Sequence, residues 1–76
     1  MKKACVIGGS GFLGSHVADQ LNLAGYKVNI YDRTPSHWCQ SGQTMIVGDI
    51  LETKKLEAAI TGCTVVYNFA ALSDLN

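Results

Sequence analysis

Three glycines near the start of the chain have the spacing of a phosphate-binding loop. Gly8, Gly11 and Gly14 lie in the run Gly8-Gly9-Ser10-Gly11-Phe12-Leu13-Gly14. Gly8 would allow the positive φ of a tight turn, and a side chain at Gly11 would keep a pyrophosphate away from the backbone. Gly14 would let a following helix pack closely on the preceding strand. The alternative is a glycine-rich turn without a ligand, so the elements around the loop decide between the two.

The residues after Gly11 would contribute backbone groups to a bound phosphate. A helix that begins at Phe12 offers unpaired N–H groups and about half a positive charge at its N-terminus. We expect Phe12 and Leu13 to present their N–H groups rather than their side chains, and we place Ser10 in the same phosphate-binding loop.

Asp32 follows a second apolar segment and lies 18 residues after Gly14. An acid roughly 20 residues after the last glycine accepts hydrogen bonds from the adenosine ribose hydroxyls in dinucleotide-binding folds. It would repel the 2′-phosphate of NADP, whereas Arg33 could bind that phosphate. The alternatives are a turn aspartate and an exposed loop arginine. Because Asp32 comes first, at the strand end, the sequence favours NAD as the cofactor.

Two further polar residues follow later apolar segments. Asp49 could accept a hydrogen bond from the adenine amino group while Ile50 contacts the ring, or it could be an ordinary turn or helix-capping aspartate. Asn68 could brace a strand end or satisfy a neighbouring backbone group. The residue types alone leave these alternatives open.

Apolar runs and periodicity predict the elements that position these residues. Short apolar runs indicate buried parallel strands, and apolar residues spaced by three and four indicate helices. We expect strands at residues 4–7, 28–31, 44–47 and 65–69, helices at 12–24 and 54–60, and a polar loop at 33–43. Gly25 would end the first helix in a left-handed conformation and Gly62 would end the second. The alternation predicts an α/β fold with parallel strands in the order 3-2-1-4 and a crevice between strands 1 and 4.

Length and composition exclude several other classes of protein. Seventy-six residues make one small domain, with 47% hydrophobic residues, 16% charged residues and no net charge. The charge balance argues against nucleic-acid or acidic-membrane partners, and no apolar run approaches the roughly 20 residues of a membrane span. Three widely spaced cysteines form neither a disulfide framework nor a metal pattern. We therefore expect a cytoplasmic protein without a metal site.

The motifs together resemble the extended short-chain dehydrogenase/reductase superfamily. Within it, the chain is most similar to the NAD-dependent sugar-nucleotide epimerases and dehydratases. The resemblance rests on residues 6–14 and on Tyr31-Asp32-Arg33, Gly48-Asp49-Ile50 and Asn68-Phe69-Ala70-Ala71. It implies the first half of a Rossmann-type doubly wound parallel sheet. It also implies that Phe69, Ala70 and Ala71 line the cofactor near its nicotinamide half. Asn68 stands where many members have histidine, and Ser73 where several epimerases have lysine.

The catalytic part of the family pattern is not found in these residues. The family uses a tyrosine followed four residues later by a lysine, but Ile30, Pro35 and Ala71 stand four residues after the three tyrosines. We therefore expect residues 1–76 to be the N-terminal part of one NAD(P)-binding Rossmann domain, with no catalytic residue and no activity alone. The resemblance implies a parent enzyme that takes a nucleotide-sugar substrate and could be a homodimer. The alternatives are a non-catalytic nucleotide-binding module and an NADP-dependent reductase of the same superfamily.

Overall fold

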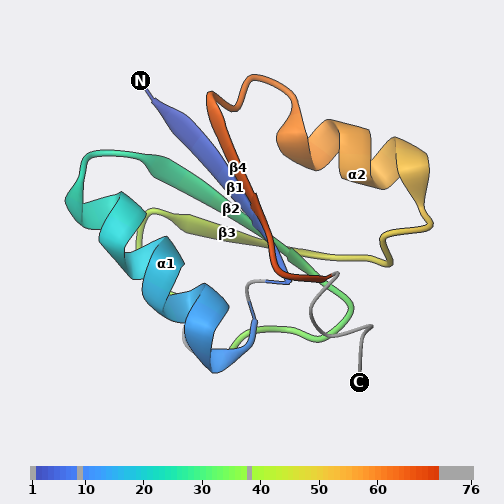
Figure 1. The fold of residues 1–76 in the computed structure, drawn as a ribbon, viewed down its shortest axis with the longest axis horizontal. Helices are drawn as coiled ribbons and strands as arrows, with labels where there is room; N and C mark the ends of the chain where they lie inside the picture. Colours follow the sequence, from blue (N-terminus) through green and yellow to red (C-terminus); the bar gives the residue numbers. More distant parts are fainter. Residues whose placement is uncertain (1, 9, 38, 71–76) are drawn as a thin grey trace.

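One parallel sheet forms the centre of the chain. The computed structural model describes residues 2–8, 10–37 and 39–70. In this part of the chain the sheet contains β1 (Lys3–Ile7), β2 (Lys27–Asp32), β3 (Gln43–Val47) and β4 (Val65–Asn68). All pairings are parallel and the order is β3-β2-β1-β4, as Figure 1 shows. This order confirms the α/β, Rossmann-type arrangement expected from the sequence.

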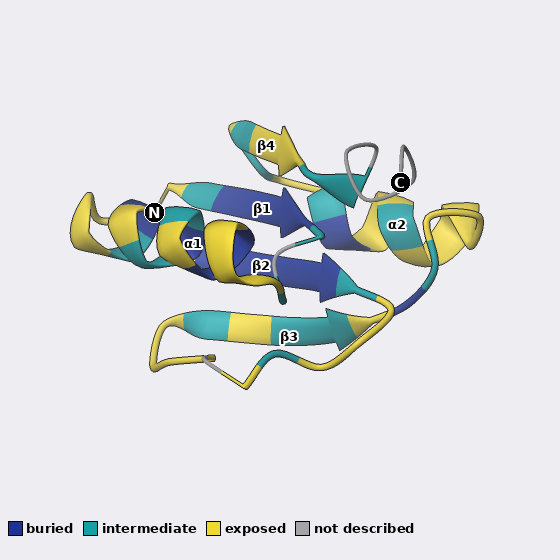
Figure 2. Cartoon of the chain, turned by 60° about the horizontal axis from the view of Figure 1, so that its bottom comes forward, coloured by how far each residue is buried: buried dark blue, intermediate teal, exposed yellow. Residues whose placement is uncertain are grey.

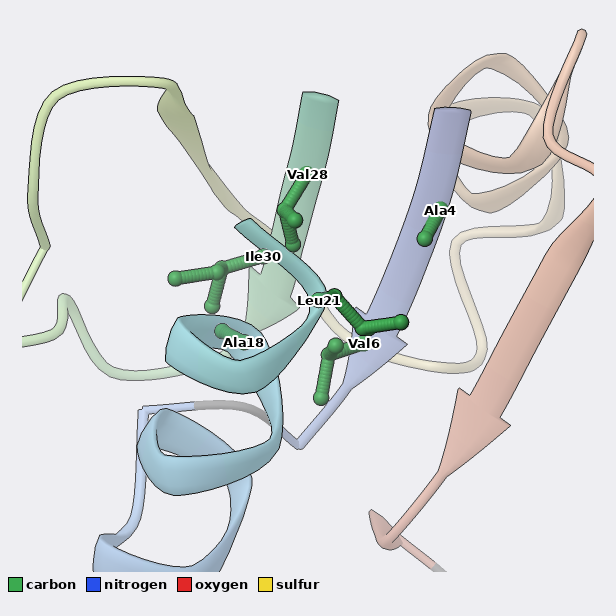
Figure 3. Packing of buried hydrophobic residues seen from close by; sticks show 6 residues of the cluster. All are labelled: Ala4, Val6, Ala18, Leu21, Val28 and Ile30. Atoms are coloured by element: carbon green, nitrogen blue, oxygen red, sulfur yellow. The ribbon is translucent and has the colours of Figure 1, made fainter. Parts of the chain in front are cut away.

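Two helices cover opposite faces of the sheet (Figure 1). The face under α1 (Phe12–Leu23) holds Val6 and Ile30 together with Ala18 and Leu21 of the helix, and Figure 3 shows this packing. The face under α2 (Thr53–Ile60) holds Cys5, Ile7 and Tyr31 against Ala59. Successive residues of a strand point to opposite faces, so a strand covered on both sides is mainly apolar. The buried polar residue Asn29 of β2 is accommodated because its Nδ2 donates to the Ala59 carbonyl at 2.9 Å.

The two inner strands are more deeply buried than the two outer ones (Figure 2). Residues 4–7 of β1 and 28–31 of β2 are buried, whereas β3 and β4 contain no buried residue. On β4, Val66 and Tyr67 remain 45% and 42% exposed. The continuous apolar runs therefore predicted the inner strands well, but β4 lacks a neighbour on its outer edge among the described residues.

Both helices end close to the glycines that were expected to terminate them. Gly25 and Gly62 come directly after the C-caps and have φ values of +94° and +78°, which confirms the left-handed stop at Gly25. The second helix begins at Thr53, one residue before the predicted start at Lys54, and its first apolar residue is Leu56. Its first turn is polar and exposed, so apolar periodicity detects only the part that packs on the sheet.

The cysteines differ in their exposure. All three are free thiols: Cys5 is buried in β1, Cys39 is exposed and Cys63 is half-buried. Burial raises the pKa of the Cys5 thiol from 9.0 to about 11, with a further contribution from Cys63.

The described residues include no helix that is long and apolar enough to cross a membrane. The same part of the chain contains no group of three or more metal-ligating side chains.

Alkylation should separate the exposed thiol from the buried one. The thiolate is the reactive form, so the raised pKa leaves Cys5 less ionised than an ordinary cysteine at pH about 8. We expect iodoacetamide to modify Cys39 within minutes and Cys5 only after denaturation. Peptide mapping by mass spectrometry would measure both rates, with Cys39→Ser as the control. Rapid labelling of Cys5 in the folded protein would contradict the packing of β1.

Candidate functional site

The carboxyl ends of the parallel strands meet at one edge of the sheet and enclose a cleft. The cleft has a volume of about 270 Å³ and is lined by Ile7, Gly8, Tyr31, Asp32, Arg33, Gly48, Asp49, Ile50, Leu51 and Ala70. These residues end or directly follow their strands. The topology thus brings together six of the residues singled out from the sequence: Gly8, Asp32, Arg33, Asp49, Ile50 and Ala70.

Gly8 occupies a position that only glycine can fill without strain. Its φ of +78° confirms the predicted left-handed turn. A Cβ there would lie 2.9 Å from the backbone nitrogen of Ala70 and 3.1 Å from the carbonyl carbon of Phe69. The backbone N–H of Gly8 donates to the carbonyl of Tyr31 at 2.7 Å. The turn after β1 is therefore locked between β2 and the residues that follow β4.

Gly11 differs from Gly8 because the described residues do not require a glycine there. It is the N-cap of α1 with φ −75° and ψ 172°, which other residues also adopt, and a Cβ would meet no atom of residues 2–8, 10–37 and 39–70 within 4 Å. No side chain caps the helix, and its first turn holds no acidic residue. Phe12 and Leu13 are exposed, while Gly14 is buried on the sheet side. The helix N-terminus thus opens onto free space beside the cleft.

The carboxylate of Asp32 is held by donors from two loops. Its Oδ2 accepts hydrogen bonds from the Ser10 N–H at 3.1 Å and the Ser10 hydroxyl at 2.6 Å. Its Oδ1 accepts one from the Thr34 N–H at 3.2 Å. Burial acts to raise the pKa of Asp32, but the bonds from Ser10, Thr34 and the Arg33 backbone outweigh it and lower that pKa. Asp32 is therefore an anchored anion at neutral pH, and Arg33 beside it is exposed.

The turn after β3 forms another wall of the cleft. Asp49 Oδ1 accepts a hydrogen bond from the Leu51 N–H at 3.0 Å, and the Asp49 N–H donates to Glu52 Oε1 at 2.9 Å. The bond to Leu51 is the turn-aspartate arrangement, one of the two interpretations that the sequence left open. Asp49 nevertheless lines the cleft together with Ile50, so the turn still presents both residues to a ligand.

Tyr31 is a wall residue that the sequence patterns did not single out. It is fully buried, and its hydroxyl donates to the Asp49 carbonyl at 2.6 Å. Burial raises the pKa of Tyr31, and the charges of Glu52 and Asp49 add to the effect, so the hydroxyl remains a donor. A Cβ at Gly48 would lie 2.5 Å from this hydroxyl. A tyrosine inside a buried strand needs a hydrogen-bond partner for its hydroxyl. That requirement could have indicated from the sequence that Tyr31 bonds to a residue of the cleft wall.

Removal of this hydroxyl should loosen the wall of the cleft. In Tyr31→Phe the Asp49 carbonyl loses its donor and the turn 48–52 is less firmly held. If the cleft binds adenosine, affinity should fall roughly three- to tenfold, the range of one ordinary hydrogen bond. Calorimetric titration with AMP would measure the change. An unaltered affinity would show that the turn is held without Tyr31.

The residues after β4 show two different environments. Asn68 Oδ1 accepts a hydrogen bond from the Ala70 N–H at 3.0 Å, so Asn68 satisfies a neighbouring backbone group. The Phe69 side chain is half-buried against the cluster beneath α1, and its ring stacks on Tyr67 at a centroid distance of 6.5 Å. Ala70 lines the cleft. Ala71 and Ser73 lie outside the described residues.

The comparison with protein families agrees with this geometry. The model of the NAD dependent epimerase/dehydratase family matches residues 4–76. The chain belongs to this family. The matched residues include the glycine loop, all four strands from Ala4 onward and Asp32 at the end of β2.

The relatives of this chain are named for different compounds. The chain is 37% identical over 70 residues to mouse sterol-4-alpha-carboxylate 3-dehydrogenase, decarboxylating, covering 92% of this chain and 19% of that protein. It is 34% identical to a UDP-N-acetyl-alpha-D-glucosaminuronate decarboxylase of Bacillus cytotoxicus, covering 95% and 25%. The crystal structure of Brucella ovis UDP-glucose 4-epimerase in complex with NAD is 32% identical with a TM-score of 0.75, covering 91% and 22%. The chain thus spans about a fifth to a quarter of the length of these relatives.

Proposed function

We propose that residues 1–76 are the N-terminal, cofactor-binding part of one Rossmann domain in a longer NAD-dependent enzyme. The observation that carries the proposal is the convergence of the open glycine loop and the anchored Asp32 carboxylate on one cleft. A pyrophosphate-binding loop needs a tight turn after its strand and a place where the pyrophosphate can approach the backbone. The close-packed backbone at Gly8 provides the turn, and the open space at Gly11 allows the approach.

The dimensions of the cleft fit one half of a dinucleotide. Ligand pockets typically enclose about 300–1,000 Å³, and the cleft of about 270 Å³ lies just below that range. An adenosine would occupy the space between Asp32 and the turn containing Asp49 and Ile50. The pyrophosphate would then lie along the glycine loop, at the N-terminus of α1. The nicotinamide half would extend toward Phe69, Ala70 and Ala71, where the family resemblance places it.

Each part of the chain would have a separate role in binding. Phe12 and Leu13 would offer N–H groups to the pyrophosphate, Ser10 of the same loop would hold the Asp32 carboxylate, and Gly14 would keep α1 close to the sheet. Asp32 would accept a hydrogen bond from the adenosine ribose and repel a 2′-phosphate, with Arg33 acting in the opposite direction. NAD, when bound, supplies a hydride acceptor. The described residues would bind and orient it, while proton transfer would depend on a Tyr-x-x-x-Lys pair outside them.

We propose a nucleotide-sugar as the substrate of the intact enzyme. The Brucella ovis and Bacillus cytotoxicus relatives are both named for UDP-sugars, which supports this class. A 3-hydroxysterol is the second candidate, because the mouse relative is named for a sterol carboxylate and has the higher identity. Both classes present a secondary alcohol that could lose a hydride to NAD.

We expect the intact enzyme to be a homodimer, which light scattering would test.

Turnover by the full-length protein distinguishes the two substrate classes. The protein should be incubated with NAD and either UDP-hexoses or a 3β-hydroxysterol carboxylate. We expect conversion of a UDP-hexose, seen by NMR, without lasting accumulation of NADH at 340 nm. Stoichiometric NADH from the sterol would favour the second class. NAD binding without turnover of either class would favour a non-catalytic module.

A further inference from the structure

One carboxylate oxygen of Asp32 receives both of the hydrogen bonds that Ser10 donates. The hydroxyl bond of 2.6 Å falls in the short range typical of bonds to an ionised acceptor, and the N–H bond is 3.1 Å. These bonds join residues that lie 22 positions apart in the sequence, one in the glycine loop and one at the end of β2. The other oxygen, Oδ1, receives the Thr34 N–H at 3.2 Å, and the Arg33 backbone N–H also bonds to the carboxylate.

The protein itself uses most of the acceptor capacity of the Asp32 carboxylate. A carboxylate offers about four lone-pair sites, two on each oxygen. The two bonds from Ser10 fill those of Oδ2, and the backbone N–H groups of Thr34 and Arg33 also donate to the carboxylate. The backbone of Asp32 is held as well, because its carbonyl accepts a hydrogen bond from the Gly48 N–H at 2.9 Å. The side chain thus has a fixed orientation, and Oδ1 is the oxygen to which Ser10 does not donate.

We infer that Ser10 is a positioning residue that sets the choice between NAD and NADP by fixing the carboxylate of Asp32. The inference rests on the proposed function and deepens it. A ribose hydroxyl donates to Oδ1, the oxygen to which Ser10 does not donate. A 2′-phosphate at the same place meets an anion that cannot rotate away, because both donors of Ser10 hold Oδ2. Without the Ser10 hydroxyl, Asp32 can turn toward solvent, and the exposed Arg33 then faces the phosphate with less opposition.

Ser10→Ala tests this role because it removes one donor and keeps the other. The variant loses the 2.6 Å hydroxyl bond but retains the backbone N–H bond. Dissociation constants for NAD and NADP would be measured by calorimetry on the full-length protein. We expect the ratio of the NADP constant to the NAD constant to fall about tenfold, the effect of one hydrogen bond to a charged group. Ser10→Thr keeps the hydroxyl and should restore the ratio.

A second serine gives a matched control. The Ser15 hydroxyl donates to the Phe12 carbonyl at 2.8 Å, near the same loop but away from Asp32. Ser15→Ala therefore removes a hydroxyl of the same size, and any general effect on the loop should weaken both cofactors alike with the ratio unchanged. Melting temperatures of all variants would show that each remains folded.

The outcomes separate this inference from the proposed function. An unchanged ratio in Ser10→Ala, or tighter NAD binding because the hydroxyl competes with the ribose, would overturn the role of Ser10 while NAD binding stands. Absence of NAD binding by the unmodified protein would instead overturn the proposed function, and the inference with it.

Discussion

Replacement of Gly11 by valine should abolish most of the NAD affinity while the protein stays folded. A Cβ at this position would lie more than 4 Å from its neighbours in the described part of the chain, so the fold has room for the side chain. The same space lies in front of the N-terminus of α1, where the pyrophosphate would bind. Loss of two bonds from N–H groups to a charged phosphate corresponds to an affinity at least about 100-fold weaker. Calorimetry and thermal melting would measure affinity and stability on the same samples.

Gly8→Val is the matched control for this substitution. It places the same side chain three residues earlier, where φ is +78° and a Cβ would collide with the backbone of Ala70. This variant should lose stability as well as binding, because it combines backbone strain with a steric clash. Unchanged NAD binding in Gly11→Val would show that the loop does not contact the pyrophosphate.

The second large effect is expected at Asp32. In Asp32→Ala, NAD loses an acceptor for its ribose, while NADP escapes the repulsion between a carboxylate and its 2′-phosphate. Like charges placed side by side in an interface cost several kcal/mol, so the preference for NAD should fall by roughly two orders of magnitude. Arg33, which lines the same cleft, is then free to bind the phosphate. Titration of both cofactors against the two proteins would measure the change.

The protonation state of Asp32 adds a pH signature. Its hydrogen bonds lower the pKa of the carboxyl below the usual 3.8, so the carboxylate stays ionised throughout the neutral and mildly acidic range. Any decline in the preference for NAD between about pH 8 and pH 5 should therefore follow protonation of the 2′-phosphate of NADP, whose second pKa is about 6, and a further decline should follow only as the pH falls toward the lowered pKa of Asp32. Asp49→Ala is the control, because it disturbs the turn beneath the adenine and should weaken both cofactors alike. Equal binding of NAD and NADP by the unmodified protein would show that Arg33 sets the choice.

Local patterns in the sequence predicted the elements and their order. The apolar runs around Val6 and Ile30 are long enough to mark strands covered on both faces, and one glycine beyond each helix marked its end. The strand order follows from the alternation of strands and helices. These features depend on neighbours within a few residues, so they can be recognised from spacing alone. The polar start of α2 carries no such periodicity, and its first residue, Thr53, was not predicted.

The contacts within the site depend on register and could not be predicted. The pairing of Ile7 with Tyr31 across β1 and β2 decides which residues face each other at the carboxyl edge. It places Ser10 against Asp32, and the pairing of Tyr31 with Ile46 brings the tyrosine hydroxyl beneath Asp49. The residue types suggested which groups could bind a cofactor. The structure adds which of them are already bonded to the protein, as Asp32 and Asp49 are.

Calorimetric titration of the unmodified full-length protein with NAD and NADP tests the central claim most directly. The anchored Asp32 carboxylate and the open loop at Gly11 predict saturable binding of one NAD per chain. The dissociation constant for NADP should be about 100-fold or more above that for NAD. Failure to bind either cofactor, with the protein folded by circular dichroism, would contradict the account.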